Sequence, residues 1–149
     1  MQLNSNKFEA VALSGIGNLT HLKVLDLRNN RLGDGCMEHL CSLKNLTELS
    51  ISNNQITDAG MARAGELSQL TYLDLTTNLI TDEGAGSLLG LGKLTHLYLM
   101  ANRISQQIVP QIFKNLEGLE VLDIRFTISD AAVKDSLRSA KPPKLQLFC

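Results

Sequence analysis

The stretch LKVLDLRNNRL at residues 22–32 decides the fold of this chain, because it recurs along the sequence at a fixed distance. The later copies read LTELSISNNQI at 46–56, LTYLDLTTNLI at 70–80 and LTHLYLMANRI at 94–104. The copies start at residues 22, 46, 70 and 94, so the period is 24 residues, and a fifth copy starts one residue late at Leu119. A period of this length is typical of solenoids, in which each repeat packs against its neighbours.

The apolar residues of each copy alternate in the manner of a strand. Leu25 and Leu27 lie two residues apart, so both point to one side of a strand while Asp26 points to the other. Stacking the copies predicts a parallel sheet, with Leu22 and Leu32 filling the layers beside it.

The second half of each repeat predicts a short helix. TDAG at 57–60 and TDEG at 81–84 each supply a Thr that can cap the first turn and an Asp that suits the positive end of the helix dipole. Gly33-Asp34 and Ser129-Asp130 are variants of this start, and SQQIVP at 105–110 departs from it. The fourth repeat should therefore differ locally in shape.

One polar residue keeps its place in four successive copies. A side-chain amide there can both donate to and accept from the backbone of the neighbouring turns, which satisfies polar groups that the bend would otherwise bury unpaired. We predict a structural ladder of asparagines formed by Asn30, Asn54, Asn78 and Asn102.

The pattern L-x-x-L-x-L-x-x-N-x-(L/I) resembles the leucine-rich-repeat family over nearly the whole chain. The resemblance implies an α/β solenoid, a horseshoe segment with a parallel sheet on its concave face and short helices on its convex face. The T-D-x-G helix start is similar to the ribonuclease-inhibitor-like and cysteine-containing subfamilies, although repeats of 24 residues are shorter than is usual there. The subfamily stays open at this point.

The length of 149 residues predicts a single leucine-rich-repeat domain over 1–149. We expect a truncated N-terminal capping repeat at 1–21, four regular repeats at 22–118 and an irregular C-terminal repeat and end at 119–149. In the first of these units, the three strand positions are assigned to Phe8, Val11 and Leu13.

The C-terminal end predicts one more helix and one more strand. Residues 130–139 form an amphipathic helix with Ala132, Val133 and Leu137 facing inward, and Pro142-Pro143 ends it. Leu145 and Leu147 then offer a last inward pair. This final strand either closes the stack or leaves an edge that could pair with a partner.

Composition narrows the class of partner. Fourteen basic and fifteen acidic residues give a net charge of -1 without any basic block, which argues against nucleic acid and against an anionic membrane surface. The first residues lack the long apolar run that is typical of a signal peptide, and no apolar run reaches about 18 residues, so we do not expect membrane insertion. Cys36, Cys41 and Cys149 are an odd set without a CxxC, which predicts three reduced thiols. We expect a cytoplasmic protein, or one acting in the host cytosol after delivery if it is a bacterial effector.

A catalytic constellation is hard to assemble from these residues. The remote alternative is an enzyme that uses His96 with Asp74 or Asp123 on the neighbouring strands. No Cys or Ser lies on the same strand faces to complete a triad, and an open solenoid face does not exclude water. We therefore expect no enzymatic activity, no cofactor, no metal and no small-molecule substrate.

The outward strand positions are the ones that packing leaves free to carry function. Both tyrosines of the chain fall there, in the third and fourth copies, and exposed Tyr and Met side chains are frequent interface anchors. A polar rim would set the orientation of the partner. The predicted partner-binding residues of the concave face are Tyr72, Asp74, His96, Tyr98, Met100, Asp123, Arg125 and, just beyond, Phe126.

These observations favour a module that binds another protein through its concave face. The family resemblance implies a scaffold or adaptor, or an inhibitor that regulates a partner enzyme, and a bacterial effector or a regulator of one also fits. The other hypothesis is a structural fragment of a larger leucine-rich-repeat protein.

Overall fold

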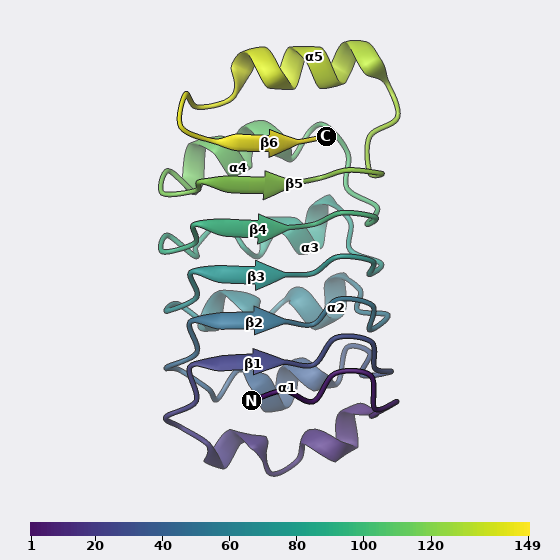
Figure 1. Ribbon diagram of the computed structural model, residues 1–149, viewed down its shortest axis with the longest axis vertical. Coiled ribbons are helices and arrows are strands. Elements are labelled where there is room, and N and C mark those ends of the chain that lie inside the picture. The colour runs from purple at the N-terminus through teal and green to yellow at the C-terminus, as the bar shows by residue number, and fades with distance from the viewer.

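The sheet of this protein has six parallel strands, stacked in the order in which they occur along the chain (Figure 1). The computed structural model describes residues 1–149. Neighbouring strands pair with Leu25, Leu49, Leu73 and Leu97 directly in line, so the predicted parallel sheet is confirmed. The strands are β1 (Val24–Asp26), β2 (Glu48–Ser50), β3 (Tyr72–Asp74), β4 (His96–Tyr98), β5 (Val121–Asp123) and β6 (Gln146–Phe148).

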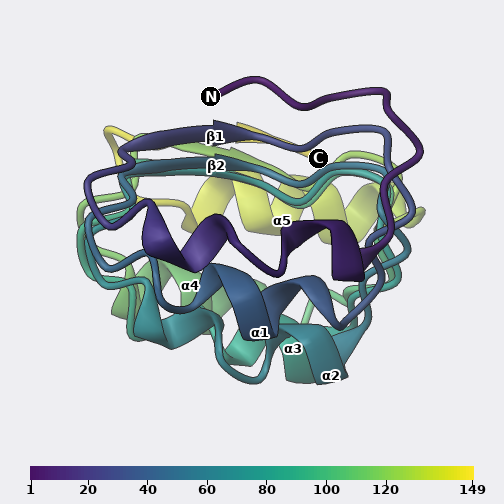
Figure 2. The same ribbon diagram turned by 90° about the horizontal axis from the view of Figure 1, so that it is seen from below.

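Short helices form the second layer, behind the sheet in Figure 1 and below it in Figure 2. Each connects one strand to the next, as a parallel pairing requires. The α-helices are α1 (Cys36–Leu40), α2 (Asp58–Met61), α3 (Asp82–Gly86), α4 (Val109–Asn115) and α5 (Ala131–Ala140). Three 3₁₀-helices occupy the remaining turns, η1 (Ala10–Leu13), η2 (Ile16–Asn18) and η3 (Ala64–Glu66). The α/β leucine-rich-repeat solenoid predicted from the sequence is the fold observed.

The core lies between these two layers and forms one continuous apolar cluster. On β1 to β4 the inward Leu and Ile side chains are almost fully buried, whereas the residue between each inward pair stays partly exposed. Stacking is what buries the core, because one repeat alone leaves its leucines open on both sides.

The asparagine ladder runs along the turn that follows each strand. Asn54 is fully buried, and its amide nitrogen donates to Leu27 O and Ser52 O at 3.0 Å each. The Oδ1 of Asn78 accepts from the backbone N–H of Asn54 and of Ile56 in the repeat before it. Each amide therefore ties its own turn to the turn of the preceding repeat.

A second ladder, which sequence reasoning missed, joins the helix starts. Thr57 and Thr81 cap α2 and α3 as predicted, by accepting from the N–H two residues further on. The hydroxyl at each helix start also donates to the Asp of the preceding repeat. Thr81 Oγ1 donates to Asp58 Oδ2 at 2.6 Å, and Ser105, at the same position of the next repeat, donates to Asp82 Oδ2 at 2.5 Å. The Asp thus serves the next repeat rather than only its own helix dipole.

The final Gly of the T-D-x-G start has a steric reason. A Cβ on Gly84 would overlap the carboxylate of Asp58 and the side chain of Ile80. The missing side chain is therefore what lets the Asp of one repeat reach the helix start of the next.

The N-terminal strand prediction was wrong in register. Gln2 forms a parallel bridge with Asp26, and Leu3 N donates to Asp26 O, so the strand-like segment is residues 1–5. Phe8 lies in the loop after this segment, and Val11, assigned to an inward strand position, lies in η1 with 74% of its surface exposed. The period of 24 in fact extends back to residue 2, since 26 minus 24 is 2.

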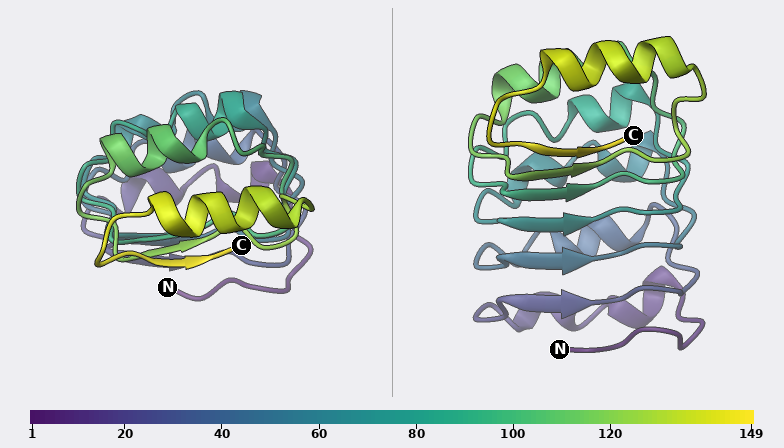
Figure 3. Two further views of the ribbon diagram at one scale, coloured as in Figure 1. Left: turned by 90° about the horizontal axis from the view of Figure 1, so that it is seen from above. Right: turned by 45° about the horizontal axis from the view of Figure 1, so that its top comes forward.

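Helix α5 covers the C-terminal end of the stack (Figure 3). Asp130 caps it by accepting from Ala132 N and Val133 N. Leu137 is buried and Val133 half-buried, but Ala132 is exposed, which corrects its predicted inward position. Strand β6 follows as the edge strand, with Leu147 half-buried against the core.

Candidate functional site

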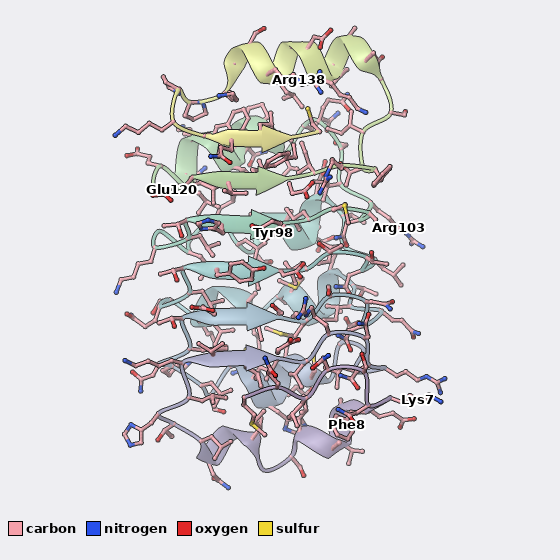
Figure 4. All side chains as sticks on the ribbon, viewed as in Figure 1. Lys7, Phe8, Tyr98, Arg103, Glu120 and Arg138 are labelled. Carbon is pink, nitrogen blue, oxygen red and sulfur yellow. The ribbon has the colours of Figure 1, made fainter.

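The candidate site is the sheet face turned toward the viewer in Figure 4, where the side chain of Tyr98 is labelled. Strand register alone brings its residues together, since Tyr72 lies directly beside His96 and Asp74 directly beside Tyr98. Strands in a sheet are about 4.8 Å apart, so outward side chains on β3 and β4 touch.

Three rings form one cluster on this face. The rings of Tyr72 and Tyr98 have centroids 5.3 Å apart at an interplanar angle of 44°. The rings of Tyr72 and His96 stack with centroids 6.1 Å apart and an angle of 29°. All three side chains are half-buried, so they support one another and still present a surface. We call Tyr72, His96 and Tyr98 the ring cluster.

The carboxylate of Asp74 influences both tyrosines. Partial burial raises the pKa of Tyr72 and of Tyr98 above the ordinary value, and the negative charge of Asp74 raises both further. Both hydroxyls therefore stay protonated at neutral pH and can act as donors. Asp74 itself accepts the backbone N–H of Thr76 at 3.0 Å through Oδ1.

The predicted polar rim differs from expectation at Asp123. Its exposed fraction is only 3%, because Arg125 covers it with Nε at 3.0 Å from Oδ1 and Nη2 at 2.6 Å from Oδ2. The same pairing occurs between Asp26 and Arg28, where the guanidinium holds the pKa of the Asp26 carboxyl below its usual value. Arg125 thus presents the charge at the rim, and Asp123 does not.

Phe148 is a residue of this face that sequence reasoning missed. The guanidinium carbon of Arg125 lies 5.6 Å from the centroid of its ring, and Phe148 pairs in register with Asp123. The alternation around Leu147 was a sufficient signal, because neighbours of an inward residue point outward.

Two predicted residues flank the ring cluster rather than join it. Met100 is half-buried on the outward column beside the strand ends. Phe126 is 80% exposed in the turn after β5, with a positive φ of 60°, and makes no ring contact with the cluster. It lines a separate cleft of about 440 Å³ at the C-terminal end, together with Arg125, Ile128, Lys134 and Cys149.

His96 forms no hydrogen bond with Asp74 or Asp123, the two carboxylates considered as its acid–base partners. His96 Nδ1 lies 2.9 Å from Thr95 Oγ1, while Asp74 serves Thr76 and Asp123 serves Arg125. No cleft of the molecule is lined by His96. No group of three or more His, Cys, Asp or Glu side chains is placed to hold a metal ion.

The cysteines add no reactive centre to the concave face. Cys36 and Cys41 are buried free thiols at the two ends of α1. Burial and then the charge of Asp34 raise the pKa of Cys36 to about 12, so its thiol stays protonated.

The leucine-rich-repeat model matches the chain over residues 1–56 and 44–104, which together are more than half of its length. The chain belongs to the leucine-rich-repeat family. The matched residues include the N-terminal segment from residue 1. Leucine-rich-repeat domains generally serve as protein–protein interaction modules.

Solved structures show the same fold in other leucine-rich-repeat proteins. An internalin, InlF from Listeria monocytogenes, is 28% identical with a TM-score of 0.70, over 89% of this chain and 36% of that one. The functional domain of InlJ from the same organism, described as including a cysteine ladder, is 22% identical with a TM-score of 0.55, over 73% of this chain and 21% of that one. The chain thus spans about a third of the length of the InlF chain and about a fifth of the length of the InlJ chain. No curated protein sequence matches it.

The helices of this leucine-rich-repeat protein are short. The longest, α5, has 10 residues, and none has the length and apolar character needed to cross a membrane.

Proposed function

We propose that this leucine-rich-repeat chain binds a partner protein through its concave face, with the ring cluster at the centre of the interface. The observation that carries the proposal is the packing of three half-buried rings, including both tyrosines of the chain, on an open sheet face. Such aromatic anchors dominate binding energy in many interfaces.

The surroundings of the ring cluster support the same proposal. Arg28 on one side and Arg125 on the other are each held by an Asp of the same strand, which fixes their guanidinium groups. Fixed charges around an aromatic centre favour one orientation of the partner. Roles as an adaptor or as an inhibitor of a partner enzyme both require this kind of surface.

The test is an affinity capture from cell lysate that compares the wild type with the double variant Tyr72→Ser/Tyr98→Ser. Serine is preferred to aspartate, because position 98 lies between Asp74 and Asp123 in register and a third carboxylate there would be repelled. The matched control is Glu83→Ser/Gln111→Ser, two exposed residues on the helices of the convex side.

The proposal expects a protein that the wild type and the convex control retain and the tyrosine variant loses. Equal retention by all three proteins would move the binding surface away from the concave face. Loss by the convex control alone would place it on the helices.

A further inference from the structure

Three outward positions of the sheet carry an aspartate with the same local geometry. Each accepts, through Oδ1, the backbone N–H of the residue two positions further on. The pairs are Asp26 with Arg28 at 3.1 Å, Asp74 with Thr76 at 3.0 Å and Asp123 with Arg125 at 3.1 Å. The same backbone hydrogen bond therefore holds one oxygen of each of the three carboxylates.

Two of these carboxylates are filled by the chain itself. Asp26 receives Arg28 Nε at 3.0 Å and Nη2 at 2.8 Å, and Asp123 receives the same two nitrogens of Arg125. Position 76 holds Thr in place of Arg, so no guanidinium of the chain pairs with Asp74. Its Oδ2 accepts no hydrogen bond within the protein, although Oδ1 does.

The aromatic surroundings repeat as well. Arg125 lies between the Asp123 carboxylate and the ring of Phe148, which is the residue paired with Asp123 on the next strand. Tyr98 is the residue paired with Asp74 on the next strand. Asp74 and Tyr98 therefore repeat the arrangement of Asp123 and Phe148, but no guanidinium is hydrogen-bonded to Asp74; the charge of Arg28, which is paired with Asp26, acts on it without a direct contact.

The ring of Tyr72 is a second aromatic side chain near this carboxylate. It lies 5.3 Å from the ring of Tyr98, and the charge of Asp74 acts on both phenols. A planar cation between a carboxylate and two electron-rich rings gains from ion pairing and from cation–π attraction together.

We propose that Asp74 and Tyr98 bind an arginine side chain of the partner protein, with its guanidinium paired to the Asp74 carboxylate and stacked on the Tyr98 ring. This inference rests on the proposed function, since it names the chemistry that the concave face recognises. Arginine fits better than lysine, because a planar fork matches a carboxylate with two hydrogen bonds and an ammonium group does not.

The test is an NMR titration of the full chain with N-acetyl-arginine amide, read on the ring resonances of Tyr72 and Tyr98. The matched probes are the citrulline amide, which has nearly the same shape without the charge, and the lysine amide. We expect saturable shifts with arginine, affinity lower by about tenfold with citrulline, and an intermediate value with lysine.

Two variants test the same site from the protein side. Thr76→Arg should supply a guanidinium from the chain, as at positions 28 and 125, and Asp74→Asn should remove the charge that holds one. Each should weaken arginine binding by about tenfold. Glu83→Gln removes an exposed carboxylate from helix α3, away from the sheet face, and should leave the affinity within about twofold.

Equal affinity for arginine and citrulline, no saturable shift with any probe, or unchanged binding in Asp74→Asn would overturn the inference. The capture experiment separates this from failure of the proposed function. A partner that is lost with the tyrosine variant but retained by Asp74→Asn and Thr76→Arg would show that the concave face binds a protein without an arginine at this position.

Discussion

The ladder positions and the outward strand positions lie within a few residues of each other in every repeat, yet they differ in what they tolerate. The ladder asparagine is the same residue in four successive copies and is almost completely buried each time. The outward column beside it changes from Asp26 to Ser50, Asp74 and Tyr98 and remains partly exposed. The ladder residues that stabilise the stack are thus the same in these four copies, and the outward residues can differ between copies without changing the stack.

The largest stability effect should come from the ladder. Asn54→Ala removes the partner of two buried carbonyls, Leu27 O and Ser52 O, and should lower the free energy of unfolding by about 3 kcal/mol. Urea denaturation followed by circular dichroism measures the change. The control is Asn45→Ala, an exposed amide with one hydrogen bond to Thr20 O, which should cost less than about 0.5 kcal/mol. Similar losses of unfolding free energy in Asn54→Ala and Asn45→Ala would contradict the special role of the ladder asparagine.

The glycine of the helix start should be the next most sensitive position. Gly84→Ala pushes a methyl group into the Asp58 carboxylate that holds Thr81, and should cost about 2 kcal/mol. Gly86→Ala, in the same helix, meets nothing within 4 Å and should be neutral or stabilising by up to about 1 kcal/mol. A loss of thermal stability in Gly84→Ala but not in Gly86→Ala would confirm the steric reason, whereas equal destabilisation of both variants would point to the helix itself.

A smaller effect should appear with pH at the threonine–aspartate ladder. Burial opposes ionisation of Asp58, but the hydrogen bonds from Thr81 and Gly84 outweigh it and lower its pKa below 3.8. The unfolded chain therefore binds the proton first as the pH falls, so this stabilisation is complete above pH about 5 and is lost progressively below it. The urea concentration at the midpoint of unfolding should therefore change less between pH 6 and pH 3 in Asp58→Asn than in the wild type. An equal difference in the two proteins would remove Asp58 as a source of the acid sensitivity.

The sequence predicts the periodic part of this molecule well, for a physical reason. Leu25 and Leu27 mark the strand and Asn30 the turn in one copy, and three further copies repeat the signal at the same spacing. The N-terminal segment was misplaced because it retains only Leu3, Asn6 and Phe8 of the motif, which is too little to outweigh an apolar pattern further on.

Contacts between repeats were harder to predict than the repeats themselves. Asp58 stands beside its own helix start in the sequence, but its hydroxyl partner Thr81 lies 23 residues later. On the concave face, alternation identifies which side chains point outward. It does not reveal that Arg125 covers Asp123 while Asp74 has no such cover, because alternation does not fix the conformation in which the Arg125 side chain folds back onto the carboxylate.

The smallest stability change is expected where the effect on binding is expected to be largest. Tyr98→Ser removes a half-buried ring from an open face and leaves the inward residues Leu97 and Leu99 in place, so unfolding should change by less than about 1 kcal/mol. The same variant should lose retention of the partner in the capture experiment. A protein that melts early would mean that the ring cluster mainly stabilises the sheet. Unchanged folding with lost binding would instead separate the two classes of position, because the same substitution would leave the stack intact and remove its recognition surface.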